Sequence, residues 1–132
     1  MDKTKLIENY RDLDVYRAAF AWQQALFTAS KSFPRDEMFS LTDQIRRSSR
    51  SIGSNIAESW AKRRYPAHFV SKLSDADGEL QETFHWLRTA FCCEYLPESD
   101  STSLAEQGYE LGRLLGATIA NYKSFCIHQP QR

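Results

Sequence analysis

Glu82 and His85 come nearest, in residue type and spacing, to a catalytic motif in this chain. An E-x-x-H spacing places a carboxylate and an imidazole on one helix face, and di-iron bundles use two such motifs with further glutamates to hold their metals. Here the motif occurs once, since neither His68 nor His128 has a glutamate three residues before it. A metal-dependent bundle enzyme is therefore one hypothesis, and a solvated helix surface is the other.

No other pattern in the chain suggests chemistry. The sequence has no G-x-G-x-x-G or Walker pattern, and no strained elbow that would present a nucleophile. Cys92, Cys93 and Cys126 are odd in number and lack C-x-x-C spacing, which favours reduced thiols over disulfides or a zinc site. We therefore predict a protein that is not an enzyme and has no metal or other cofactor.

The composition is that of a folded protein of one domain, residues 1–132. Hydrophobic residues make up 42% of the chain and aromatic residues 13%, which is enough to form a core. Seventeen basic and seventeen acidic residues cancel, so the net charge indicates neither a nucleic-acid nor a membrane partner. Because no apolar leader or membrane-length apolar run occurs, we expect a cytoplasmic protein without membrane association.

Apolar residues at steps of three and four predict the helices that position these groups. The first helix is expected over about residues 12–32, and Pro34 breaks its pattern. Ser40, with Asp43 three residues later, resembles a capping box, so the second helix is expected to open there.

The second half of the chain repeats this organisation. Pro66 suits the first turn of a third helix, whose apolar period continues to about Leu96, before Pro97. Ser103 and Glu106 resemble a capping box that opens a fourth helix. Since the links are short and no segment alternates as a strand does, we predict an all-α fold: an antiparallel up-down-up-down four-helix bundle.

The second helix carries small residues where a solvent-facing side normally carries long charged ones. Gly53, Ala57 and Ala61 form a ridge at four-residue spacing, and Arg46 and Arg50 extend it. Small residues let another helix approach closely, which would offset the cost of a mid-helix glycine, about 1 kcal/mol against alanine. We interpret these five residues as an oligomer interface, although small residues tolerated on an exposed surface would give the same pattern.

Charge is distributed unevenly between the second and third helices. Six basic and two acidic residues give residues 43–64 a net charge of +4, whereas two basic and seven acidic residues give 65–100 a net charge of −5. Lys62, Arg63 and Arg64, beside Tyr65, could meet phosphates and an unstacked base of a nucleic acid. A solvated basic turn is the alternative, and the sequence alone does not choose.

At these residues the chain resembles a family of small four-helix bundle proteins first noticed as reading frames in intervening sequences of bacterial 23S rRNA genes. The resemblance is carried by DLDVYRAA at 12–19, FPRDE at 33–37, LTDQIRRSSRSIGSNIAES at 41–59 and ADGELQE at 76–82. The chain departs from the family pattern at four positions: Arg50 replaces an apolar residue, Gly53 a proline or similar residue, Ser59 a glycine and Glu79 a serine.

The resemblance implies an antiparallel four-helix bundle that assembles into a ring-like homopentamer without established catalytic activity. It also implies importance for the matching motif positions Arg46, Arg47, Ser51, Asn55 and Glu58. We expect Asn55 and Glu58 to supply buried or half-buried hydrogen-bonding groups that set helix register, and the arginines to pair with acidic residues of a neighbouring subunit.

Two further functions remain as alternatives to a non-catalytic oligomeric scaffold. A related branch, the accessory protein of diversity-generating retroelements, is a basic pentamer that binds nucleic acid and a reverse transcriptase, whereas this chain is neutral. The first alternative is therefore an RNA- or DNA-binding accessory protein that uses the basic second helix, Arg46–Arg64. The second is the metal-dependent bundle enzyme.

Overall fold

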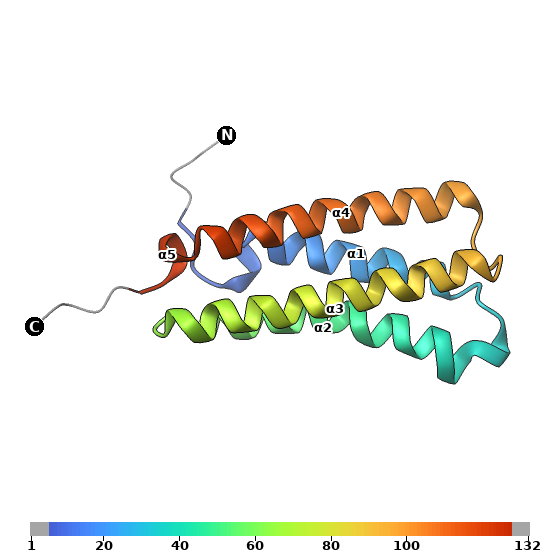
Figure 1. Cartoon of the computed structure of the whole chain (residues 1–132), viewed down its shortest axis with the longest axis horizontal. Helices are drawn as coiled ribbons and strands as arrows, with labels where there is room; N and C mark the ends of the chain where they lie inside the picture. Colours follow the sequence, from blue (N-terminus) through green and yellow to red (C-terminus); the bar gives the residue numbers. More distant parts are fainter. Residues whose placement is uncertain (1–5, 128–132) are drawn as a thin grey trace, which may run out of the picture.

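The computed structural model describes residues 6–127, and these form an all-α bundle. Four long helices follow one another: α1 (Asp14–Ser30), α2 (Asp43–Ala61), α3 (Pro66–Cys92) and α4 (Glu98–Ala120). Figure 1 shows consecutive helices running in opposite directions, as predicted. Short helical turns cover the ends of the bundle: Tyr10–Asp12 before α1, Arg35–Glu37 and Met38–Thr42 before α2, and α5 (Tyr122–Phe125) after α4.

The core is one cluster to which all four long helices contribute about one apolar residue per turn. Its most enclosed large side chains are Trp22 and Leu26 of α1, Ile45, Ile52 and Ile56 of α2, Phe69, Leu73 and Leu80 of α3, and Leu111 and Leu115 of α4. Each helix packs against two neighbours: α1 against α2 and α4, and α3 against the same two. None of the helices within residues 6–127 combines the length and hydrophobicity that a bilayer span requires.

Two buried hydrogen bonds join neighbouring helices inside this core. The indole Nε1 of Trp22 donates to the backbone carbonyl of Leu104 on α4 at 2.8 Å. The hydroxyl of Thr83 on α3 donates to Ser48 Oγ on α2, also at 2.8 Å. Buried polar groups without partners would be costly, so these bonds favour one arrangement of the helices.

The predicted start of the third helix at Pro66 is confirmed, but both predicted capping boxes are wrong. A π-helical turn, Met38–Thr42, leads directly into α2, and the Ser40 hydroxyl donates to the Glu37 carboxylate instead of capping a helix. Helix α4 begins at Glu98, directly after Pro97 in an extended conformation, so Ser103 lies within the helix. A proline sets φ and cannot continue a preceding helix, which makes it the stronger boundary signal here.

Helix α3 also ends earlier than expected, at Cys92 rather than near Leu96. Glu94 takes a left-handed conformation, with φ of 63°. The next residue, Tyr95, donates its backbone N–H to the Ala90 carbonyl at 2.9 Å, the six-to-one bond of a Schellman ending. This turn brings the Tyr95 phenol to Glu37, to which it donates a hydrogen bond of 2.8 Å.

Candidate interaction surface

The ridge predicted on α2 winds from the inside of the bundle to its surface. Arg46 is half-buried and Gly53 is buried, both on the side that faces α1. Ala57 is half-buried, whereas Arg50 and Ala61 are exposed. Because four residues rotate by about 400°, roughly 40° more than a full turn, a ridge at this spacing drifts around the cylinder. The interpretation of all five residues as one outer ridge is therefore wrong for Gly53, which is buried.

Gly53 packs within its own chain. A Cβ atom at this position would lie 3.5 Å from Cε1 of Tyr16 and 3.7 Å from Oε1 of Gln23, both on α1. These are ordinary van der Waals distances, so packing against α1 does not require glycine. The expectation that Gly53 makes room for a helix of another copy is thus corrected, because α1 of the same chain occupies that place.

Three cations gather around the half-buried ring of Phe27 on α1. The guanidinium carbons of Arg46 and Arg50 lie 4.6 and 5.5 Å from the ring centroid, and Nζ of Lys31 lies 5.0 Å from it. Nε of Arg46 also donates to Ser30 Oγ at 2.8 Å. Each cation is attracted to the negative face of the ring. The three like charges also repel one another, and together they make this end of the α1–α2 side positive.

A row of aromatic rings continues from Phe27 along α1. Tyr16 meets Tyr10 edge-on with ring centroids 4.8 Å apart, and stacks with Phe20 at 6.1 Å. Phe20 remains 45% exposed. The sequence-based interpretation of α2 missed these α1 residues, although Tyr16, Phe20 and Phe27 recur at helical spacing outside the apolar stripe, and that repeat was a usable signal.

We group the exposed and half-buried residues on this side of α1 and α2 as the α1–α2 surface. It comprises Tyr16, Phe20, Phe27 and Lys31 of α1 with Arg46, Arg50, Ala57 and Ala61 of α2. Its cations surround Phe27 near the end of α1, its rings Tyr16 and Phe20 lie further back along α1, and its two alanines lie in the last turns of α2. Such a mixture can receive another macromolecule by apolar contact and by charge.

The remaining family-motif residues lie on the opposite side of α2, toward α3. Asn55 donates to the Ser51 carbonyl at 2.9 Å, within its own helix. Glu58 is exposed and pairs with Lys72 of α3 at 2.7 Å, and this bond holds the pKa of the Glu58 carboxyl below its usual value. Asn55 is half-buried, as expected, whereas the expectation that Glu58 is buried or half-buried is wrong. The role of both residues in helix register stays a prediction, and the buried Ser48–Thr83 bond also joins α2 to α3.

The basic turn between α2 and α3 contains one engaged arginine and two free cations. The Arg63 guanidinium stacks on Trp60 at 3.5 Å, and its Nε donates to the Trp60 carbonyl at 2.8 Å, which caps the end of α2. Lys62 and Arg64 are exposed, and their side chains form no hydrogen bond or ion pair with residues 6–127. Of the three predicted nucleic-acid contacts, Lys62 and Arg64 are thus available to a phosphate.

The E-x-x-H motif lies on the exposed side of α3. Glu82 accepts a hydrogen bond of 3.4 Å from the Trp86 indole, and the same indole meets the His85 ring edge-on at 4.7 Å. Within residues 6–127, no three His, Cys, Asp or Glu side chains converge as metal ligands would. His128 lies outside the described residues.

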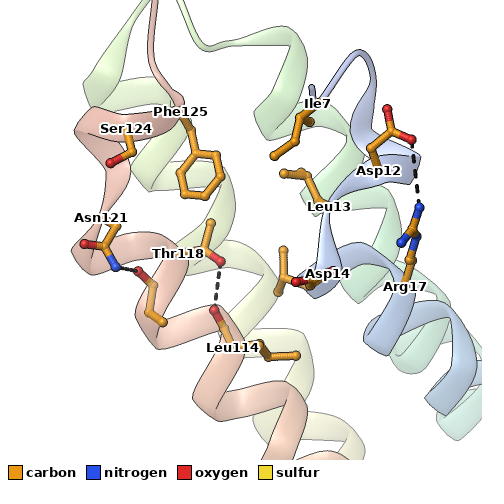
Figure 2. A pocket seen from close by; sticks show the side chains of 12 residues that line it. Ile7, Asp12, Leu13, Asp14, Arg17, Leu114, Thr118, Asn121, Ser124 and Phe125 are labelled. Atoms are coloured by element: carbon orange, nitrogen blue, oxygen red, sulfur yellow. Dashed lines mark hydrogen bonds and ion pairs between the residues drawn. The ribbon is translucent and has the colours of Figure 1, made fainter. Parts of the chain in front are cut away.

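A cleft of about 620 Å³ opens at the end of the bundle where α1 begins and α4 ends. Figure 2 shows Phe125 facing Ile7 and Leu13 across it. Two of its polar groups bond to backbone carbonyls nearby: Thr118 donates to the Leu114 carbonyl at 2.8 Å, and Asn121 donates to the Ala117 carbonyl at 2.9 Å. The cleft thus combines apolar side chains with the charged residues Asp12, Asp14 and Arg17 at the start of α1.

The order of the motifs along α1, α2 and α3 matches a known family. The family model described as 23S rRNA-intervening sequence protein aligns with residues 11–117, which include all of α1, α2 and α3 and most of α4. The chain belongs to the 23S rRNA-intervening sequence protein family. Among curated proteins, none matches the chain.

A solved structure supports this family assignment. It is the crystal structure of a protein of unknown function from the S23 ribosomal protein family of Bacteroides thetaiotaomicron VPI-5482. The two chains are 27% identical with a TM-score of 0.72, over 81% of this chain and 96% of the other. The 23S rRNA-intervening sequence family therefore explains the bundle and the α2 motif, while the α1–α2 surface has to be interpreted from its own chemistry.

Proposed function

We propose that this protein is a non-catalytic scaffold whose working form is an assembly of identical copies that bury the α1–α2 surface. The observation that carries the proposal is the exposed ring of Phe20, which stacks with Tyr16 where Tyr16 lies against the small residue Gly53 of α2. A bundle that worked alone would be expected to cover this strip with long charged side chains.

Burial of the α1–α2 surface would stabilise an assembly of copies. An aromatic side chain buries about 150–250 Å², so covering the exposed 45% of Phe20 removes roughly 90 Å² of apolar surface from water. At about 25 cal/mol per Å² this is roughly 2 kcal/mol for each copy, before the neighbouring rings are counted. The resemblance to the family implies five subunits, so the proposed assembly is a homopentamer.

Light scattering at micromolar concentration tests this proposal. The wild-type chain is expected to give a mass several times 15.3 kDa. Phe20→Arg and Ala61→Arg each place a bulky charge in the proposed contact and should lower the mass, whereas Gln107→Arg on exposed α4 should leave it unchanged. A wild-type monomer, or an unchanged mass for both variants on the α1–α2 surface, would refute the proposal.

The second candidate function is binding of RNA or DNA at the turn between α2 and α3. The free cations Lys62 and Arg64 support it, together with Tyr65, whose ring is 56% exposed and available to stack on a base. Retention on structured RNA should fall steeply as salt rises, because phosphate contacts release bound counterions. Lys62→Gln with Arg64→Gln should weaken retention and its salt dependence, and equal retention of wild type and variant would exclude this turn.

A further inference from the structure

Acidic residues gather on the outer side of α3, and we call this second strip the α3 acidic face. It comprises Asp75, Glu79 and Glu82, with the exposed small residues Ser71, Ser74 and Gly78 between them. A Cβ atom on Gly78 would meet no atom within 4 Å, so this part of α3 presents bare backbone to an approaching molecule.

The acids of this face form no ion pair within residues 6–127, although Lys72 acts on Asp75 and Arg47 on Glu79 from beyond ion-pair distance. The ion pairs among residues 6–127 are Arg17–Asp12, Lys72–Glu58 and Arg113–Glu110. Glu79 is half-buried, and this burial, followed by the charge of Glu82, raises the pKa of its carboxyl, while Arg47 offsets the rise in part. The single chain thus holds carboxylates in mutual repulsion that an external cation would relieve.

The α1–α2 surface carries positive charges that are likewise without ion pairs among residues 6–127. Lys31, Arg46 and Arg50 crowd around one ring, and none of them forms an ion pair within residues 6–127. Each chain therefore carries one unpaired positive strip and one unpaired negative strip, while its formal net charge is zero. A second copy of the same chain supplies the missing charges on both sides in equal number, which an unrelated cation or anion does not.

We propose that copies dock head to tail, with the α1–α2 surface of one copy seated on the α3 acidic face of the next. This inference rests on the proposed function and specifies which surface the α1–α2 surface meets. Lys31 and Arg50 of one copy pair with Asp75 and Glu82 of its neighbour. The exposed ring of Phe20 then lies over the small residues of α3.

Head-to-tail docking has a consequence for the type of assembly. The two strips lie on different helices of the bundle, and the outer side of α3 faces away from α1, so the contact uses two different patches and is heterologous. Such a contact produces a closed ring or an open chain, whereas two α1–α2 surfaces facing each other would give a two-fold dimer with like charges opposed.

Charge reversal tests the pairing in the full chain. The first variant combines Lys31→Glu with Arg50→Glu, and the second combines Asp75→Lys with Glu82→Lys; all four side chains are exposed in the single chain. Arg46 and Glu79 stay unchanged because they are half-buried within their own chain. Each variant alone opposes like charges and should raise the dissociation constant of the assembly by on the order of 100-fold or more.

A one-to-one mixture of the two variants provides the decisive measurement. Every contact between unlike copies joins opposite charges again, so the mixture should regain a mass above that of either variant alone; a closed ring of five still contains at least one contact between like copies, so the wild-type mass need not be reached. Assembly of the wild type should also weaken between about 0.1 and 1 M salt, as the screening length falls from about 10 to 3 Å. Circular dichroism checks that each variant folds, and the milder pair Lys31→Gln with Arg50→Gln should weaken assembly if the reversed variant unfolds.

The outcomes separate this inference from the proposed function. Wild-type mass in both charge-reversed variants, or in the glutamine variant if the reversed one unfolds, would overturn the pairing. Failure of the mixture to reassemble would overturn it too. If Phe20→Arg dissociates the assembly in either case, the α1–α2 surface remains the contact and only its partner face is wrong. A wild-type monomer refutes both.

Discussion

Gly108 on α4 provides the sharpest test of how the bundle packs. An added Cβ atom at this position would lie 2.6 Å from Cζ2 of Trp22 and 2.6 Å from Cζ of Phe84, deep between α1, α3 and α4. Real Cβ atoms do not approach carbon so closely, and both rings are held in place. Trp22 is fully buried and its indole donates to the Leu104 carbonyl, and Phe84 packs between Trp22 and Tyr109. Gly108→Ala should therefore destabilise the fold.

Gly116, two turns further along α4, provides the matched control. It is exposed, and a Cβ atom there would meet nothing within 4 Å. Both alanines gain helix propensity, up to about 1 kcal/mol, so the difference between the two variants isolates the clash. Overpacking of this kind typically costs about 1–3 kcal/mol, so Gly108→Ala should be less stable than Gly116→Ala by about that amount.

Chemical and thermal unfolding followed by circular dichroism measures this difference. For a chain of 132 residues, 1 kcal/mol corresponds to a shift of about 3–5 °C in Tm. The two variants should therefore differ by several degrees, with Gly116→Ala at or above the wild type. Protein concentration is kept equal because assembly adds to apparent stability. Equal Tm values for the two variants would show that the rings do not approach α4 as closely as described.

Three further predictions concern single side chains. Glu37 accepts the Tyr95 hydrogen bond and raises the pKa of the phenol to about 12. The stability that this bond contributes should be complete below pH 10 and should be lost as pH rises toward 12. Tyr95→Phe should abolish that loss in unfolding curves measured as a function of pH. Trp22→Phe should lower the unfolding free energy by about 2–3 kcal/mol, because it leaves the Leu104 carbonyl without its buried donor; no loss in urea unfolding would contradict this. Gly53→Ala should keep or raise the free energy of unfolding, by up to about 1 kcal/mol of helix propensity, and a clearly lower Tm would show that packing against α1 requires glycine at this position.

The helices themselves could be predicted because apolar period and proline positions are local properties. Pro66 opens α3 as expected, and the recurring isoleucines of α2 enter the core as their spacing predicts. The errors occurred where two local signals competed. Ser103 resembled a cap, but Pro97 already ends the preceding turn, and α4 begins directly after it. The left-handed residue after α3 is Glu94 and not a glycine, so no residue type marked the end of this helix in the sequence.

The sequence by itself determined the all-α class, the family and the separation of charge between α2 and α3. Only the tertiary structure decided which neighbour each face of α2 meets, because helical period specifies angles around one axis and not the element beyond it. It turned Arg46 and Gly53 toward α1 and brought Phe27 and Lys31, far from them in the chain, to the same surface. The candidate site is thus a product of helix packing, which places α1 rings beside α2 cations that no local pattern connects.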